Sequence, residues 1–229
     1  MKPKHQKVAA IIVAAGESKR MGGIDKMFAV LGGQPVLVRA TRPFQQCPAV
    51  SQIVVVAGGD NQPKCRHLMG QGEFSKVTEV CLGGKRRQDS VAAGLKRLKK
   101  CDWVIIHDGA RPLVTVDLIE RGLEAARETG AAVAAVPVTD TIKVVDSNET
   151  VYQTPLRHFL RAVQTPQIFR HDIIVRAYAR PDIDVTDDAT LAERAGYEVR
   201  LYPGSADNIK ITTRDDLARA ELLLRKYEK

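Results

Sequence analysis

The chain has 229 residues, of which 44% are hydrophobic and 27% are charged, and its formal net charge is +8. This length and composition allow a substantial buried core and argue against a disordered or fibrous protein. The sequence contains no run of about 18 apolar residues, the length that a membrane span requires. We therefore expect one globular domain over residues 1–229 without a membrane span.

The N-terminus and the cysteines both indicate the cytoplasm. The basic start MKPKHQK leads into an apolar stretch from Val8 that lacks the small-residue cleavage site of a secretory signal. The four cysteines are widely spaced and form no C-x-x-C pair. Such spacing predicts reduced thiols and offers no zinc site.

Short β-branched runs alternate with longer amphipathic segments, which is typical of a mostly parallel sheet with helices on both faces. The runs that we expect to form strands are 8–15, 52–58, 77–83, 103–107 and 131–138. Helical spacing is found at 35–46, 88–99 and 117–129. Pro43 lies inside the first of these helical segments and is expected to end or kink the helix.

The alternation changes after Val138. Residues 139–169 resemble two short strands around a Ser-Asn-Glu turn, followed by an irregular piece and another strand. Such an insertion forms either an edge hairpin or an arm that reaches a partner subunit. Beyond it we expect a helix at 171–179, a helix opened by Thr186 and Asp187, strands at 198–204 and 208–212, and a closing helix.

A glycine-rich, basic loop follows the first predicted strand. Ligands of open parallel sheets bind at the carboxyl ends of the strands. The stretch AAGESKRMGGIDKMF combines glycines with Arg20 and Lys26, which suits an anion. Its spacing fits neither the P-loop nor the G-x-G-x-x-G motif, which argues against a kinase-type NTPase and a dinucleotide dehydrogenase.

Polar groups also lie at or just beyond the ends of three further predicted strands. GGKRRQDSV offers glycines, basic residues and Ser90 near a helix start. HDGARP places Asp108 where a carboxylate can face a ligand or a magnesium ion, and ADNIKIT presents Asp207 and Lys210. Aromatic residues make up only 5% of the chain, too few for a base-stacking surface. These groups favour a small polyanionic substrate over a nucleic-acid duplex.

These stretches, together with VQTPQIF and TDDA in the same order and spacing, resemble the 2-C-methyl-D-erythritol 4-phosphate cytidylyltransferase family over residues 8–224. The resemblance implies a single-domain, Rossmann-like nucleotidyltransferase fold of the glycosyltransferase-A type, with a mostly parallel sheet and an extended β-arm. It implies transfer of CMP from CTP to 2-C-methyl-D-erythritol 4-phosphate, with Mg²⁺ as cofactor. The products would be pyrophosphate and 4-diphosphocytidyl-2-C-methyl-D-erythritol, a precursor in the non-mevalonate isoprenoid pathway.

The resemblance also assigns roles to single residues. The residues implied in catalysis are Arg20, Lys26, Arg157 and Lys210. Those implied in nucleotide binding are Ala14, Ala15, Gly16, Gly83 and Ser90. Those implied in acceptor binding are Asp108, Arg111, Thr141, Arg157, Thr186 and Lys210, and Asp108 is also the candidate metal ligand.

In this family the arm is exchanged between two subunits. The resemblance therefore implies a homodimer whose arm, at about 139–163, brings Thr141 and Arg157 to the acceptor site of the neighbouring subunit. An arginine suits this role because its planar fork binds a phosphate through two hydrogen bonds. His107 invites a general-base role, but an acceptor phosphate is already ionised at neutral pH, so a structural role is expected.

Two other functions stay open at this point. D-Ribitol 5-phosphate cytidylyltransferase shares the loops and the fold, so the nucleotide-site motifs do not separate the two acceptors. The net charge also suggests a non-catalytic nucleotide- or RNA-binding module, which would be expected to lack Lys26 or Lys210, yet both are present. We therefore expect small-molecule substrates and no nucleic-acid or membrane partner.

Overall fold

The computed structural model describes residues 6–16, 21, 25–179 and 184–227. The strands are β1 (Val8–Ala14), β2 (Val30–Leu31), β3 (Gln34–Pro35), β4 (Val50–Ala57), β5 (Val77–Leu82), β6 (Trp103–Asp108), β7 (Ala131–Pro137), β8 (Val144–Val145), β9 (Val151–Gln153), β10 (Arg161–Arg170) and β11 (Arg200–Pro203). The α-helices are α1 (Val36–Gln46), α2 (Gln62–Met69), α3 (Arg87–Leu95), α4 (Val116–Thr129), α5 (His171–Tyr178), α6 (Asp188–Arg194) and α7 (Arg214–Tyr227), and the segments η2 (Gly59–Asn61) and η3 (Arg157–Phe159) are short 3₁₀ helices.

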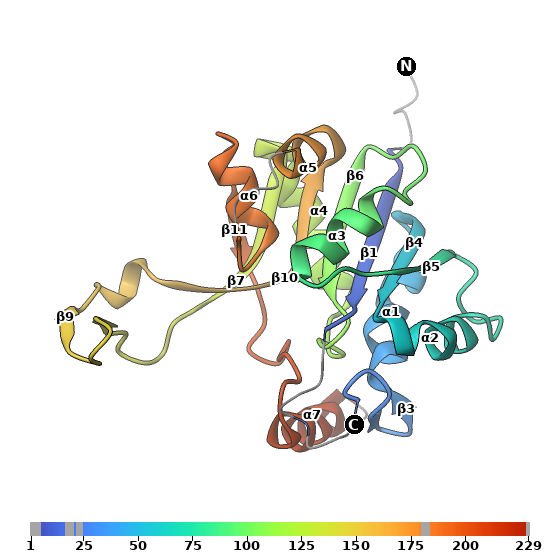
Figure 1. Ribbon diagram of the computed structural model, residues 1–229, viewed down its shortest axis with the longest axis horizontal. Helices are drawn as coiled ribbons and strands as arrows, with labels where there is room; N and C mark the ends of the chain where they lie inside the picture. The colour runs from blue at the N-terminus through green and yellow to red at the C-terminus, as the bar shows by residue number, and fades with distance from the viewer. Residues whose placement is uncertain (1–5, 17–20, 22–24, 180–183, 228–229) are drawn as a thin grey trace.

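Seven strands form the central sheet in the order β11-β7-β10-β6-β1-β4-β5 (Figure 1). Strand β1 pairs in parallel with β4 and β6, and β4 pairs in parallel with β5. Only β10 runs against its two neighbours in this sheet, β6 and β7. The predicted mostly parallel α/β sheet is therefore confirmed.

Helices cover both faces of the sheet. In β1, Ala10 and Ile12 pack into a core beneath α1, α2 and α4, whereas Ile11 and Val13 pack into a core beneath α3, α5 and α6. Every residue of β1 is buried, as expected of a strand that is covered on both sides. A third cluster joins α7 to β2 and to Ile211. None of the helices within the described ranges is long and apolar enough to cross a membrane.

Two details of the predicted helices can be compared with the structure. Helix α3 ends at Leu95 and not near Lys99, which corrects the prediction. Helix α1 continues past Pro43 to Gln46, so the proline does not end it. A proline in a helix removes the hydrogen bond to the carbonyl four residues earlier, and the remaining turn of α1 is stabilised by Phe44, which is fully buried in the core.

The segment 208–212 is a further correction. It was expected to form a strand, but these residues, all of which the structure describes, have no strand pairing. The backbone N–H of Ile211 instead donates to the carbonyl of Ala110 at 2.8 Å, and the side-chain amide of Asn208 donates to the carbonyl of Thr165 at 2.8 Å. The segment is thus an irregular loop held against the carboxyl edge of the sheet.

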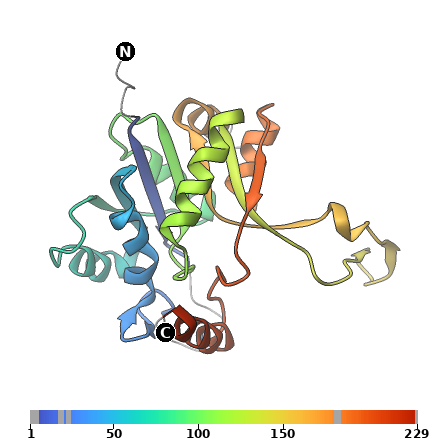
Figure 2. The same cartoon turned by 180° about the vertical axis from the view of Figure 1, so that it is seen from behind.

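An arm leaves the body of the molecule between β7 and β10 (Figures 1 and 2). Its tip is the predicted hairpin, in which Val144 pairs with Gln153. Arg161, at the start of β10, pairs with Pro137 of β7. The base of the expected arm, 161–163, is therefore already part of the sheet, while the tip reaches away from it.

Candidate active site

The topology brings the functional loops together at one edge of the sheet. From β1 the chain moves to β4 and β5 on one side and then returns to β6 on the other side. Ligands of open α/β sheets bind at such a reversal, outside the carboxyl ends of the strands. Val13 near the end of β1 lies opposite Asp108 at the end of β6. Because β10 is antiparallel to β6, its early residues Gln164 and Thr165 lie at the same edge.

A cleft of about 440 Å³ opens at this edge, and we call it the nucleotide-side cleft. It is bordered by the loops after β1, β4, β5 and β6. The lining residues are Val13, Ala15, Gly16, Asp25, Lys26, Met27, Gly58, Gly59, Asp60, Asn61, Gly83, Gly84, Lys85, Arg86, Arg87, Ser90, Asp108, Ala110 and Lys210. Most of the residues predicted for nucleotide binding and catalysis therefore share one hollow.

Of the described residues predicted for nucleotide binding and catalysis, Ala14 and Arg157 are not on the wall of this cleft. Ala14 is 1% exposed, and its side chain belongs to the core beneath α1 and α4. Only its backbone can therefore serve a ligand. Arg20 lies outside the described residues.

Close approaches between loops shape the cleft. A Cβ atom placed on Gly83 would lie 2.5 Å from the Cβ of Ala15 and 2.6 Å from the Oγ of Ser90. Gly83 is therefore glycine because the loop after β5 passes directly against the loop after β1 and against α3. Gly16 is less crowded, since an added Cβ would lie 3.7 Å from the Nζ of Lys26, an ordinary contact distance.

Asp108 is held between two cations. Its Oδ1 accepts from the Nε of Arg87 at 3.0 Å, and its Oδ2 lies 2.8 Å from the Nζ of Lys210. Burial alone raises the pKa of this carboxyl, but the charges of Arg87, Lys210 and Arg111 outweigh burial and hold its pKa well below the usual range. Asp108 is therefore ionised at neutral pH.

A second, smaller hollow of about 230 Å³ lies on the other side of Asp108, and we call it the acceptor-side pocket. It is lined by Arg87, Asp108, Arg111, Val163, Gln164, Thr165, Gln167, Thr186, Asp187 and Lys210. Four of the residues predicted for acceptor binding are among them. Arg87, Asp108 and Lys210 line both hollows and form their common border.

The loop that carries Lys210 is fixed by side chains that the sequence analysis did not single out. The side-chain amide of the buried Asn208 donates to the carbonyl of Thr165, and the backbone carbonyl of Asn208 accepts from Nη1 of Arg111 at 2.6 Å. Gln164 donates to the carbonyl of Ser205 at 2.9 Å. These bonds hold Lys210 over Asp108 without a sheet ladder.

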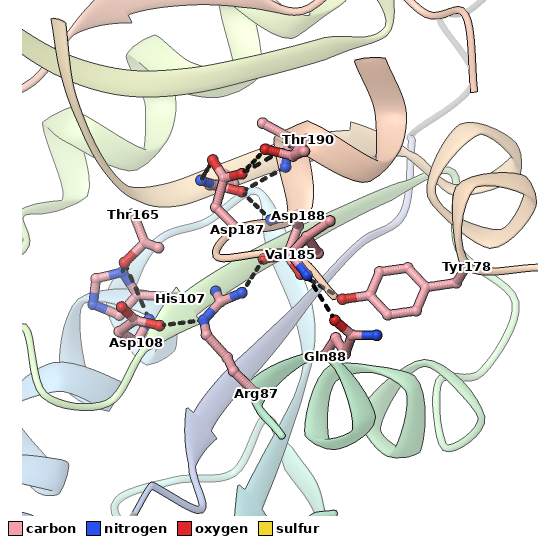
Figure 3. Close-up of polar contacts among 12 residues, drawn as sticks. Arg87, Gln88, His107, Asp108, Thr165, Tyr178, Val185, Asp187, Asp188 and Thr190 are labelled. Carbon is pink, nitrogen blue, oxygen red and sulfur yellow. Dashed lines mark hydrogen bonds and ion pairs between the residues drawn. The ribbon is translucent and has the colours of Figure 1, made fainter. Parts of the chain in front are cut away.

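His107 is structural, as its chemistry predicts. The ring is fully buried, with Nδ1 3.0 Å from the hydroxyl of Thr165 and Nε2 3.1 Å from the carbonyl of Arg111 (Figure 3). Burial lowers the pKa of His107 to about 4. Both ring nitrogens are thus occupied, and the imidazole is neutral at physiological pH.

Thr141 and Arg157 lie on the arm. Both are exposed, and within the described part of the chain neither lines the two hollows. The Nη1 of Arg157 donates to the carbonyl of Thr139 at 2.6 Å, which fixes the side chain against the segment that follows β7 into the arm. Within a single chain, the arm residues are therefore separate from the residues of the sheet edge.

The carboxylates of the nucleotide-side cleft are Asp25, Asp60 and Asp108. Among the residues that the structure describes, no three or more His, Cys, Asp or Glu side chains are grouped to hold a metal ion. This set does not provide a complete protein cage. It fits Mg²⁺ as that ion is bound with nucleotides, through one or two carboxylates and the substrate phosphates.

Arg87 is the main site residue that sequence reasoning missed. It stands in the quoted stretch GGKRRQDSV, where three consecutive basic residues gave no indication of which one points inward. The available signal was its place at the first turn of a helix, facing the strand that ends in Asp108. In the structure its side chain is 22% exposed, against 44% for Arg86.

A glycine-lined cleft that adjoins a cationic pocket at the sheet reversal defines a nucleotide-dependent transferase with a small anionic acceptor. The family model of 2-C-methyl-D-erythritol 4-phosphate cytidylyltransferase matches residues 8–226. The chain therefore belongs to this family, and it is a nucleotidyltransferase enzyme.

Individual relatives agree with this assignment. The chain is 50% identical over 222 residues to 2-C-methyl-D-erythritol 4-phosphate cytidylyltransferase of Dehalococcoides mccartyi, an alignment that covers 97% of this chain and 98% of that protein. The structure is similar to that of 4-diphosphocytidyl-2C-methyl-D-erythritol synthase from Anaerococcus prevotii, with a TM-score of 0.86 at 28% identity, covering 97% of this chain and 100% of that one. It is also similar to the Thermus thermophilus cytidylyltransferase, with a TM-score of 0.76 at 34% identity, covering 96% and 99%. The predicted fold of this family is thereby confirmed.

Proposed function

We propose that the protein transfers CMP from CTP to 2-C-methyl-D-erythritol 4-phosphate, and that it forms pyrophosphate and 4-diphosphocytidyl-2-C-methyl-D-erythritol. The observation that carries this proposal is the common border of the two hollows at Arg87, Asp108 and Lys210. A reaction between two anions requires sites that meet at positive charge. Membership of the family and the names of the relatives support the choice of acceptor.

The chemistry is a displacement at the α-phosphorus of CTP. A phosphate oxygen of the acceptor attacks the α-phosphorus, and the bond from that phosphorus to the bridging oxygen of the β-phosphate breaks, so pyrophosphate leaves with the electron pair. The nucleophile is already ionised, so this reaction needs no general base. Negative charge grows on the phosphoryl oxygens and the leaving group, and we assign its stabilisation to Lys26, Lys210 and Arg20.

The nucleotide is assigned to the cleft beside Gly83. Ala15, Gly16 and Gly83 leave the backbone open to close approach, and Ser90 offers a buried hydroxyl at the start of α3. We assign backbone contacts to Ala14 as well. These groups suit the cytosine, the ribose and the phosphates of CTP, and the basic residues Lys26, Lys85 and Arg86 also line the cleft.

The acceptor is assigned to the pocket beside Asp108. Its phosphate would be paired with Arg111 and Lys210, while Asp108 and Thr186 offer polar atoms to the hydroxyl groups. We infer that Thr141 and Arg157 complete this site from the arm of a second subunit. The arm suits an interface because Tyr152 and Phe159 on it are 68% and 76% exposed. The proposed form is therefore a homodimer.

Magnesium is assigned to the nucleotide-side cleft. Asp108 would supply one carboxylate oxygen, and the phosphates of CTP would supply further ligands. Both oxygens of Asp108 are paired with cations, so ion binding requires Lys210 to turn toward the substrate. When bound, Mg²⁺ would neutralise charge on the triphosphate. All four cysteines are free thiols, which suits the reducing cytoplasm that we propose as the location.

The test is pyrophosphate release from CTP with Mg²⁺ and one of two acceptors. We expect 2-C-methyl-D-erythritol 4-phosphate to be strongly preferred over D-ribitol 5-phosphate. A preference for ribitol 5-phosphate would overturn the proposed acceptor while leaving the nucleotide chemistry in place. Release with neither acceptor would overturn the proposed reaction.

A further inference from the structure

Arg87 connects three parts of the fold that lie far apart in sequence. It is the first residue of α3, directly after the loop that carries Gly83. Its Nε is 3.0 Å from Oδ1 of Asp108 at the end of β6, and its Nη1 is 2.8 Å from Oδ2 of Asp188 at the start of α6 (Figure 3). One guanidinium thus holds two carboxylates at fixed positions.

Asp188 is the fixed end of this bridge. Its side chain is 1% exposed, and its Oδ1 accepts from the hydroxyl of Tyr178 at 2.5 Å. Its backbone N–H donates to Oε1 of Gln167 on β10 at 3.1 Å. Asp188 is therefore held by α5, by the sheet and by Arg87, and it determines the direction in which the guanidinium points toward Asp108.

The next residue of α3 strengthens the same connection. Oε1 of Gln88 accepts from the backbone N–H of Val185 at 3.1 Å. The short segment from Val185 to Asp188 is thus attached to α3 at both of its ends. Between these ends lie Thr186 and Asp187, which line the acceptor-side pocket.

The position of Arg87 makes it the connection between the two substrate sites. The start of α3 borders the nucleotide-side cleft, and the two carboxylates that Arg87 holds border or support the acceptor-side pocket. On the basis of the proposed function, we propose that Arg87 is a positioning residue that makes the acceptor site depend on the nucleotide site. It does so by fixing the carboxylate of Asp108 and the segment from Val185 to Asp188 relative to α3.

The physical basis is the cost of an unpaired buried charge. Removal of Arg87 leaves Asp188 buried without its cation and leaves Asp108 with Lys210 as its remaining ion-pair partner, so both carboxylates are free to move or to draw in water. The acceptor then loses a preformed site. Arg87 carries the proposed coupling between the two sites, so its removal should abolish the dependence of acceptor affinity on CTP. Such coupling between two ligands is reciprocal.

The experiment begins with the wild-type protein, so that failure of the proposed reaction is seen there and not in the variants. Arg87→Gln and Arg87→Lys are then compared with the matched control Arg97→Gln, which removes an arginine just beyond α3 that is 57% exposed and pairs with Glu79. The readouts are the Kd for CTP by calorimetry without acceptor, and the acceptor KM at limiting and saturating CTP.

For Arg87→Gln we expect the acceptor KM to rise by about tenfold or more, with the Kd for CTP changed by less than about threefold. Arg87→Lys should lie between, because an ammonium group can reach one carboxylate but does not present the planar fork that binds two. Arg97→Gln should match wild type. An equal rise in the Kd for CTP would show that Arg87 is a nucleotide ligand, and an unchanged acceptor KM would show that it positions nothing; either result overturns the proposal.

A double variant separates positioning from simple stability. Arg87→Met leaves Asp188 buried as an unpaired charge, and addition of Asp188→Asn removes that charge while keeping an acceptor for Tyr178. We expect the double variant to recover most of the Tm that Arg87→Met loses, because a neutral pair replaces an uncompensated carboxylate. The acceptor KM should stay high. Recovery of the acceptor KM together with the Tm would make Arg87 purely structural and overturn the proposal.

Discussion

The ammonium group of Lys210 lies 2.8 Å from Oδ2 of Asp108 and joins the loop after β11 to the end of β6. The two partners differ in exposure, since the side chain of Lys210 is 39% exposed and that of Asp108 is 10% exposed. Arg87 holds the other oxygen of Asp108. Lys210 can therefore turn toward a substrate while Asp108 keeps its position.

Lys210→Ala should lower kcat by about 100- to 1,000-fold, because it removes a preorganised positive charge from the point where the two hollows meet. The fold should persist, since Asp108 keeps Arg87 and the loop keeps the bonds of Asn208. Steady-state rates and Tm should be measured beside Lys96→Ala, an exposed lysine at the end of α3. A rate near that of wild type would remove Lys210 from the catalytic assignment.

Gly83→Ala tests the proposed nucleotide site without a change in charge. The new methyl group would meet the Cβ of Ala15 and the Oγ of Ser90 at distances that atoms do not tolerate, so the loops must separate. We expect the Kd for CTP to rise by about tenfold or more and the stability to fall by about 1–3 kcal/mol. Calorimetry with CTP and urea unfolding measure the two effects. Unchanged CTP binding would exclude the Gly83 loop from the nucleotide site.

The sheet could be predicted from the sequence because buried parallel strands leave a clear pattern. Runs such as VAAIIVA are apolar at every position, and in the structure each residue of this run is buried. The loops after these strands are read as ligand-binding by their place in the topology. The positions of Asp108, Gly83 and Lys210 around one sheet edge follow from that reasoning.

The remaining features depend on contacts that no local pattern encodes. The polarity of the stretch NIKIT alternates as in a strand. In the structure the side chain of Asn208 attaches this stretch to the sheet through the carbonyl of Thr165, and the stretch remains a loop. The inward direction of Arg87 depends on Asp188, which lies far along the chain. Short-range periodicity carries no information about such long-range partners.

His107 should make stability depend on pH. In the folded protein burial lowers its pKa to about 4, against 6.5 when it is exposed, so the unfolded chain binds the proton more readily. The charged groups near it are Asp108, Arg111 and Arg87. Stability from this residue is therefore complete above pH 6.5 and decreases as the pH falls toward 4. Between pH 7.5 and pH 5 the loss should be about 2 kcal/mol.

The measurement is urea unfolding of the metal-free protein at pH 7.5 and at pH 5, for wild type and for His107→Gln. The variant should be less stable than wild type at pH 7.5, because Thr165 and the carbonyl of Arg111 lose a well-placed partner. It should lose less stability than wild type on acidification. Equal losses in both proteins would show that His107 is not the group that titrates.

The arm provides a test of the proposed dimer. Arg157→Ala should raise the acceptor KM far more than the KM for CTP, because Arg157 is assigned to the acceptor phosphate, whereas Lys26→Ala should lower kcat.

If each site combines Lys26 of one subunit with Arg157 of the other, a mixed dimer of the two variants has one site with both residues intact and one site with neither. Random exchange makes half of the dimers mixed, so about a quarter of the wild-type activity should return. Subunit exchange should first be verified with differently tagged copies. If exchange occurs and activity stays at the level of the separate variants, Arg157 acts within its own chain and the composite site is wrong.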